Sequence, residues 1–598
     1  MSYKVVLADA YKGYTRDLDK FITPEETVRR FKEKLKKINL DILERTERID
    51  KGRLDIPVYF SICGQDAEKI IGTRKQMGKG GTPHQAEASA VMELAERFSF
   101  FSFKGNPGNF LLEEYRNIKD SALPFENIAQ SVHDDSSELD RAREVFSRLP
   151  LKWTRGYNLT KDKELLIPFD WFFTINEFNG SSAGNCQEEA ILQGICEVVE
   201  RHVSSVISLN RLKTPAIDFN STVDPLVLEL IEKYQKEGIK LYASDFSLNT
   251  GIPSIGVLAY DPSTFPGKSE IIWTAGTTPS PQKALNRALT EVAQLAGDFN
   301  TSANYVASGL PKFKDLGEAD FVMHPDKKIG ISSLPDLSND NIKVEVENCI
   351  EALSKMGMEV ILVDITHPKL GIPAFYTIIP GAHFRELAAG SSVGMFSAKL
   401  IAESGNPVWA IKELKEMDKL LPGKYYVKFF LGSSHLSINE PIKALNYLEE
   451  ALTLDPKDQD IPSIYSYMGI SYKELQRYGE AIETLKKAEE YDRERTDVYN
   501  LMGFCYFKLK DHHKAIECFK NVLQLNPDSA IDYANIASNY RDMGDRDKAI
   551  QYYKFALELD ATIDFARDNL QIENTPQSPF AKGGSGRNAL TFRDVTLR

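Results

Sequence analysis

Hydrophobic and polar positions follow two different patterns in the two parts of the chain. Up to about residue 410, short apolar runs rich in β-branched residues alternate with longer stretches in which apolar residues recur every three or four positions. The short runs include segments that begin at Ser254, Ile361 and Tyr376. Such runs predict buried strands, and the longer stretches predict amphipathic helices. We therefore expect residues 1–410 to form a mixed α+β domain.

A regular repeat of small and large apolar residues follows. It is marked by dipeptides that begin at Ala444, Ala481, Ala515 and Ala549, which lie 37, 34 and 34 residues apart. A period of 34 residues with small side chains where two helices cross resembles the tetratricopeptide repeat. We expect four such repeats over residues 424–565, stacked into an all-α superhelix that binds a peptide or a partner protein. A linker at 411–423 and a flexible tail at 566–598 complete the predicted organisation.

Composition narrows the class of protein without indicating a function. Of the 598 residues, 42% are hydrophobic and 27% are charged, which is typical of folded domains. The net charge of −13 argues against nucleic acid as a general partner, because phosphate backbones are bound by clustered basic residues. The sequence has no apolar run long enough to span a membrane, no secretion signal and no C-x-x-C pair among its six cysteines. We therefore expect a cytoplasmic protein without structural zinc.

Three predicted helices of the first domain carry a stripe of polar residues on one face. The stripes are Ser89, Glu93, Glu96 and Arg97; then Asn185, Glu189, Gln193, Glu197, Glu200 and Arg201; then Arg287, Glu291 and Gln294. Within each stripe the residues are mostly three or four positions apart, so they are neighbours on a helix surface. Repelling glutamates at this spacing indicate a cation that neutralises them.

Carboxylates without cysteine or histidine partners are ligands that suit Mg²⁺, which is commonly shared with substrate phosphates. Arginines beside them have the planar geometry that binds phosphate oxygens. The stripes therefore predict a nucleotide triphosphate site that contains Mg²⁺. Spacing alone leaves a second interpretation open, in which these are solvated faces with Glu–Arg pairs. The segment Gly78-Lys79-Gly80 adds little, because it lacks the rest of a phosphate-binding loop signature.

The order of these motifs, with Ser182 and Asn185 leading into the second stripe, resembles the YcaO superfamily over about residues 10–400. The resemblance implies that ATP and Mg²⁺ are the cofactors. The implied metal ligands are Glu93, Glu96, Glu189, Glu197 and Glu200. The implied nucleotide contacts are Ser89, Arg97, Ser182, Asn185, Arg201, Arg287, Glu291 and Gln294. Lys12 is the expected counterpart of a lysine near the N-terminus that often contributes in this family.

Members of that family activate a backbone amide by phosphorylating its oxygen after a nucleophile has attacked. An internal Cys, Ser or Thr then gives an azoline, external sulfide gives a thioamide, and an amine gives an amidine. Azoline-forming members commonly end in a P-x-P-x-P segment, whereas this chain ends in Val595-Thr596-Leu597-Arg598. Thioamide formation or another amide modification is therefore favoured, while the nucleophile and the general base are not identified.

The expected partners follow from the two domains together. The repeats are expected to dock a peptide or protein substrate, or a protein that delivers sulfur, and a homodimer is left open. The alternative is a binding scaffold or a sulfur-transfer accessory factor of the ribosomal protein S12 methylthiolation type, with an ATP-sensing first domain. A conventional kinase is disfavoured because its sequence signatures are absent.

Overall fold

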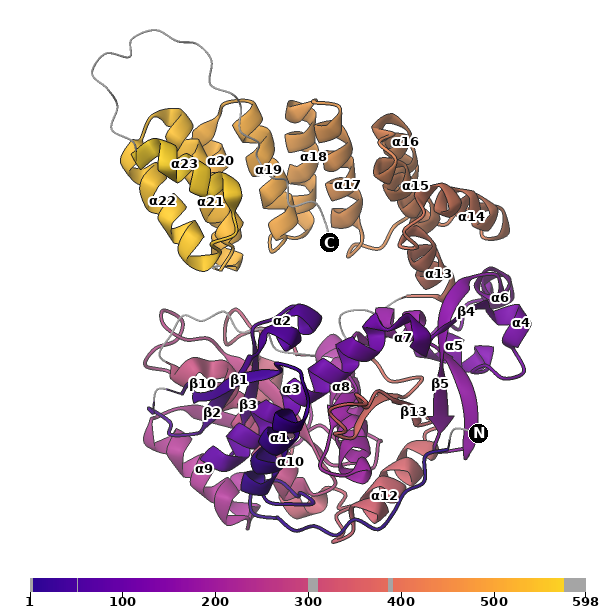
Figure 1. Ribbon diagram of the computed structural model, residues 1–598, viewed down its shortest axis with the longest axis vertical. Helices are drawn as coiled ribbons and strands as arrows, with labels where there is room; N and C mark the ends of the chain where they lie inside the picture. Colours follow the sequence, from indigo (N-terminus) through magenta and orange to yellow (C-terminus); the bar gives the residue numbers. More distant parts are fainter. Residues whose placement is uncertain (1–3, 51, 300–309, 385–390, 527, 575–598) are drawn as a thin grey trace. The chain divides into compact units, whose positions relative to one another are not determined.

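The computed structural model describes residues 4–50, 52–299, 310–384, 391–526 and 528–574 (Figure 1). The chain divides into two compact units, residues 1–396 and residues 397–598. The predicted order of a mixed α+β domain followed by all-α repeats is confirmed. Every described helix is too short or too polar to cross a lipid bilayer.

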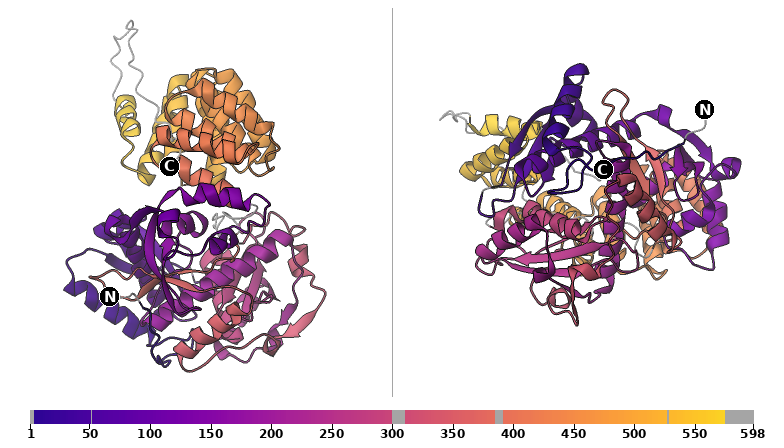
Figure 2. Two further views of the ribbon diagram at one scale, coloured as in Figure 1. Left: turned by 90° about the vertical axis from the view of Figure 1, so that its right-hand side faces the viewer. Right: turned by 90° about the horizontal axis from the view of Figure 1, so that it is seen from below.

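Three sheets form the framework of the first unit (Figures 1 and 2). The first contains β1 (Leu43–Arg48), β2 (Val58–Cys63) and β3 (Lys75–Lys79). The second has the order β11 (Ile272–Thr277), β10 (Ser254–Tyr260), β9 (Lys240–Asp245), β8 (Ala216–Asp218) and β12 (Lys328–Gly330). The third has the order β4 (Leu111–Glu114), β5 (Pro150–Asn158), β13 (Ile361–Asp364), β14 (Ala374–Ile378) and β7 (Ser181–Ala183), with β6 (Lys163–Pro168) also paired to β5. Neighbouring strands are antiparallel except β8 and β12.

Three long helices carry the polar stripes, and each packs on strands of a sheet. Asn185, which was expected on the second helix, lies in the turn just before it. Helix α3 (Pro83–Gly105) packs on β2 and β3, α8 (Gln187–Asn210) on β14 and β7, and α10 (Pro281–Ala296) on β10 and β11. The start of α3 is encoded locally, because Thr82 accepts a hydrogen bond from the Gln85 N–H and Pro83 occupies the first turn. The other helices of this unit are α1 (Pro24–Lys37), α2 (Gln65–Ile71), α4 (Tyr115–Ile118), α5 (Phe125–Ser131), α6 (Leu139–Ser147), α7 (Phe169–Asn176), α9 (Pro225–Lys236), α11 (Asp320–Met323) and α12 (Ile342–Ser354).

The second unit consists of helix pairs with the predicted period. The pairs are α15 (Tyr425–Ser437) with α16 (Pro441–Leu452), α17 (Ile461–Glu474) with α18 (Tyr478–Tyr491), α19 (Thr496–Lys508) with α20 (His512–Leu525), and α21 (Ala530–Met543) with α22 (Arg546–Leu559). Small residues are required where each pair crosses. A Cβ added at Gly469 would lie 2.6 Å from the Leu485 side chain, and one at Gly503 would lie 2.8 Å from the ring of Phe519.

Two segments at the ends of the repeats differ from the prediction. The stretch 411–423, expected to be a linker, lies mostly in α14 (Pro407–Leu420), which follows α13 (Val393–Ala402) and packs on α15. Its apolar Ala410, Leu414 and Met417 recur at helical spacing and are buried, so the segment has a core-facing side. The expected tail begins with helix α23 (Asp564–Asn574), which packs on α22, and residues 575–598 lie outside the described residues.

Candidate nucleotide and metal site

The three polar stripes meet around one cavity in the first unit, with a volume of about 640 Å³. Eleven of the predicted site residues line it: Ser89, Glu93, Glu96, Arg97, Asn185, Glu189, Glu197, Arg201, Arg287, Glu291 and Gln294. Residues that are far apart in the sequence are therefore brought together as the helical spacing predicted. Solvated faces would instead point away from one another, so the second interpretation of the stripes is disfavoured.

The remaining two predicted residues, Ser182 and Glu200, lie behind the cavity wall. The Ser182 hydroxyl is buried and donates a hydrogen bond of 2.7 Å to the Ala190 carbonyl. The Glu200 Oε2 accepts hydrogen bonds from the Thr277 N–H at 3.2 Å and from Arg287 Nε at 3.1 Å. In this structure Glu200 thus orients an arginine of the cavity.

Ion pairs link the arginines and carboxylates of the cavity. Arg97 lies 3.1 Å from both Glu93 and Glu96, measured between guanidinium nitrogens and carboxylate oxygens. Arg201 lies 3.6 Å from Glu197. Burial raises the pKa of the Glu96 carboxyl well above its usual range, and the charges of Glu93 and Glu197 add to this although Arg97 opposes it. A cation at this place would therefore be strongly stabilising.

The arrangement fits a metal site that is completed by a nucleotide. Within the described residues, no three His, Cys, Asp or Glu side chains form a ready-made cage for a metal ion. Mg²⁺ usually takes only one or two protein carboxylates and fills its octahedron with water and phosphate oxygens. Carboxylates that are spread along the cavity and paired with arginines suit that kind of shared coordination.

A loop that the sequence analysis did not single out supports the site from behind. The ring of Phe178 lies 3.9 Å from the guanidinium carbon of Arg97. The Gly180 N–H donates to Glu197 Oε2 at 3.3 Å, and the Ser181 hydroxyl donates to Glu96 Oε1 at 2.9 Å. Phe178 and Gly180 of this turn, with Ser181 at the start of β7, thus hold three cavity residues. Loop residues have no periodicity, so no sequence pattern marked them.

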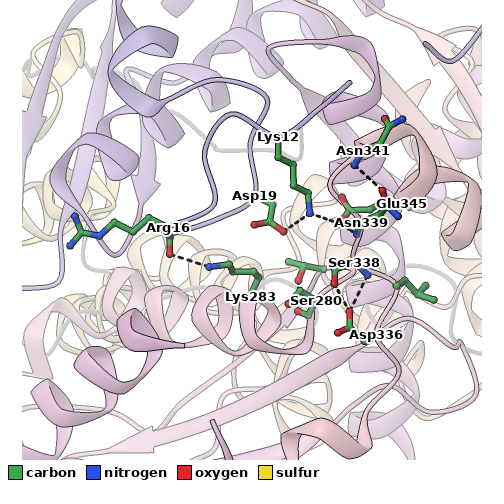
Figure 3. Close-up of polar contacts among 12 residues, drawn as sticks. Lys12, Arg16, Asp19, Ser280, Lys283, Asp336, Ser338, Asn339, Asn341 and Glu345 are labelled. Carbon is green, nitrogen blue, oxygen red and sulfur yellow. Dashed lines mark hydrogen bonds and ion pairs between the residues drawn. The ribbon is translucent and has the colours of Figure 1, made fainter. Parts of the chain in front are cut away.

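The N-terminal segment supplies a different lysine from the one predicted. The described residues that line the cavity include Lys20 but not Lys12. Lys12 is buried between Asp19 and Glu345, with its Nζ 2.6 Å from an oxygen of each carboxylate (Figure 3). Lys20 Nζ lies 3.8 Å from Glu189 Oε1, which corrects the expectation for Lys12.

This segment is tied to the helices by backbone contacts. The Phe21 N–H donates to Glu189 Oε2 at 2.9 Å, and Lys283 Nζ donates to the Arg16 carbonyl at 3.0 Å (Figure 3). Asp17 is fully buried and accepts a hydrogen bond from the Thr82 N–H at 3.0 Å, directly before α3. The ties fix the wall of the cavity that Leu18, Lys20 and Ile22 provide.

The fold and the cavity place the chain in a class of proteins in which an α+β nucleotide-binding domain precedes a tetratricopeptide-repeat domain. A family model described as YcaO cyclodehydratase, ATP- and Mg²⁺-binding, matches residues 77–383, just over half of the chain. The chain belongs to the YcaO family. Tetratricopeptide-repeat models match residues 425–458, 463–495, 496–529 and 533–563, which confirms the four predicted repeats.

Known proteins are similar to this chain over about half to two thirds of its length. An uncharacterized protein of Methanothermobacter thermautotrophicus is 27% identical over 381 residues, covering 60% of this chain and 94% of that protein. The ribosomal protein S12 methylthiotransferase accessory factor YcaO of Escherichia coli K12 is 27% identical over 296 residues, or 46% of this chain and 48% of that protein. A solved structure described as a heterocyclase in complex with substrate and cofactor has 22% identity and a TM-score of 0.52, covering 64% of this chain and 55% of that one. The last similarity shows the fold alone.

Proposed function

We propose that the first unit uses ATP and Mg²⁺ to phosphorylate a backbone amide oxygen of a peptide or protein, giving a thioamide or an azoline-type product. The family description, a cyclodehydratase that binds ATP and Mg²⁺, supports this class of reaction. The observation that carries the proposal is the cavity in which carboxylates and arginines from three helices meet. A conventional binding module would not need charged groups buried at this density.

The cationic wall of the cavity is proposed to bind the phosphates. Arg97, Arg201 and Arg287 offer planar guanidinium groups whose paired N–H donors match phosphate oxygens. Each is already oriented by a carboxylate, as in the pair between Arg287 and Glu200. Such preorganisation lowers the cost of ordering these side chains when a ligand binds.

The carboxylates of the cavity are proposed to hold Mg²⁺. Glu93, Glu96, Glu189 and Glu197 all line it, and burial raises the pKa of Glu197 as it does that of Glu96, although neighbouring arginines oppose this. When bound, MgATP supplies the phosphoryl group that turns the amide oxygen into a good leaving group. The chain's own contribution is to place the metal and the phosphates and to restrict water in the cavity.

The nucleophile decides the product. In each case a bond forms between the nucleophile and the amide carbon, and the oxygen leaves with the phosphoryl group as phosphate, while ATP becomes ADP. The similarity to the Escherichia coli accessory factor, whose name refers to methylthiolation, favours sulfur as the nucleophile. The same similarity supports a second candidate function, in which the chain assists a sulfur-transfer enzyme and uses ATP to control that partner.

The repeats are proposed to recruit the substrate polypeptide or the sulfur-delivering partner. Tetratricopeptide repeats commonly bind peptides on their concave face, and the second unit has its own buried core. A chain that ends at residue 405, between α13 and α14, should therefore keep its MgATP affinity but modify the full-length substrate at least about tenfold less efficiently in kcat/KM. Equal modification by the shortened and intact chains would contradict the docking role.

Mass spectrometry of cellular proteins tests the reaction. Cells that carry the wild-type gene should contain a peptide that has lost one water or exchanged one oxygen for sulfur. Cells with Glu197→Gln should lack that peptide, because the substitution removes a cavity carboxylate, whereas cells with the exposed Glu347→Gln on α12 should retain it. Identical modified peptides in all three strains would contradict the enzymatic function and favour the accessory role.

A further inference from the structure

The segment Gly78-Lys79-Gly80-Gly81, at the end of β3, packs so closely on its neighbours that its glycines leave no room for a Cβ atom. A Cβ at Gly78 would lie 2.5 Å from the Ala86 carbonyl oxygen, and one at Gly80 would lie 2.7 Å from the Ala86 nitrogen. A Cβ atom and a non-bonded heavy atom do not come closer than about 3 Å in a packed protein. Glycines at these positions therefore let the strand end lie directly on the backbone of α3.

The same segment also approaches the rest of the first unit closely on its other side. A Cβ at Gly81 would lie 2.6 Å from the Leu226 side chain. Lys79 is thus the one position of these four that carries a side chain. That side chain lines the cavity and is 14% exposed. The close packing that the glycines allow thus positions the Lys79 ammonium group in the cavity.

The surroundings of Lys79 would be stabilised by a bound anion. Its Nζ is paired with Glu291 of α10. Burial lowers the pKa of Lys79 well below its usual range, and the positive charges of Arg287 and Arg201 add to this, although Glu200 and Glu93 oppose it. One carboxylate therefore does not offset the cost of placing an ammonium beside two arginines. A phosphate carries more negative charge and would do so.

We propose that Lys79 binds the phosphates of the nucleotide. The inference rests on the nucleotide site proposed above and adds a residue to it. In the ligand-free protein Glu291 holds the ammonium group in the cavity, and a bound phosphate takes the place of that carboxylate. A lysine suits this exchange because its ammonium is a compact charge on a flexible stem, which can follow a ligand without a fixed approach angle. The alternative is that Lys79 serves only as a permanent counter-ion of Glu291.

Calorimetry on the full-length chain separates these roles. Lys79→Met should weaken MgATP binding about tenfold or more and change the affinity for adenosine, which has no phosphate, less than about twofold. Lys79→Arg should recover most of the MgATP affinity. Lys75→Met, on the exposed start of the same strand, is the matched control and should bind like the wild type. Equal losses for MgATP and adenosine, or no loss for either, would overturn the proposal.

Failure of the nucleotide site itself would look different, because the wild type would then bind no MgATP. Thermal melting shows whether Lys79→Met folds. A second measurement on the wild type does not depend on that variant: MgATP should protect Lys79, but not Lys75, from acylation by an amine-reactive reagent, as read by mass spectrometry. Adenosine should give no protection. Labelling of Lys79 that MgATP does not change would also overturn the proposal.

Discussion

Glu200→Gln tests whether a buried glutamate acts on the metal or on the arginines. Its side chain is 5% exposed, and one of its oxygens accepts hydrogen bonds from Arg287 Nε at 3.1 Å and from the Thr277 N–H at 3.2 Å. A hydrogen bond to a charged group contributes about 1.5–3 kcal/mol. Glutamine keeps one accepting oxygen, so we expect a loss near the lower value. MgATP affinity should then fall about tenfold, since about 1.4 kcal/mol corresponds to a factor of ten.

The assay is calorimetric titration with a non-hydrolysable ATP analogue at several Mg²⁺ concentrations. If Glu200 orients Arg287, the affinity should be lower at saturating Mg²⁺ and the Mg²⁺ midpoint should not move. If Glu200 is a metal ligand, as the family resemblance implies, the midpoint should rise instead. The exposed Glu347→Gln is the control. An affinity and a midpoint both within twofold of the wild type would refute the reasoning for either role.

Three further predictions concern other parts of the chain. Phe178→Leu should weaken MgATP binding about twofold to fivefold, because the stacking face beneath an arginine of the cavity contributes about 0.5–1 kcal/mol, and Phe178→Tyr should restore it in the same titration. Burial raises the pKa of Glu345 from 4.5 to about 7, so the folded chain retains a proton that the unfolded chain releases, and stability should fall as pH rises across that window. In guanidinium titrations between pH 5 and pH 8, the unfolding free energy of the wild type should fall by up to about 3 kcal/mol more than that of Glu345→Gln. Parallel pH curves for the two proteins would contradict the assignment. Gly503→Ala should destabilise the repeats by about 1–3 kcal/mol, since the new methyl group meets the ring of Phe519, whereas Gly479→Ala, whose Cβ meets no described atom within 4 Å, should not lower the melting temperature.

Periodicity explains which parts of the site could be predicted from the sequence. The carboxylates and arginines of α3, α8 and α10 recur every three or four residues, so one face of each helix could be assigned without coordinates. The four repeats are predictable in the same way, because their small residues recur with a period close to 34. Periodicity does not separate Glu200, which stands behind the wall, from Glu197, which lines the cavity. That difference depends on the rotation of α8 against β11.

The residues that were missed belong to segments without a period. Phe178 lies in a loop, and its contact with Arg97 joins positions that are remote in the sequence. Lys20 and Lys12 are both lysines of one extended segment, and only the path of that segment over α8 decides which one reaches the cavity. The motif around Lys79 lacks the signature of a phosphate-binding loop and so predicts little by itself, yet its glycines allow close packing in the structure.

Two of the helices that line the cavity, α3 and α10, pack on separate apolar clusters, and this has a thermodynamic consequence. Among the described residues, the apolar cluster behind α10 and the one behind α3 are distinct. A ligand that contacts both helices therefore links two hydrophobic cores that otherwise share few side chains. By mass action, a ligand at one hundred times its dissociation constant adds about 2.7 kcal/mol to the stability of the state that binds it. Because that state requires both cores, nucleotide binding should make them unfold together, so the occupancy of the cavity sets how cooperatively these two cores unfold.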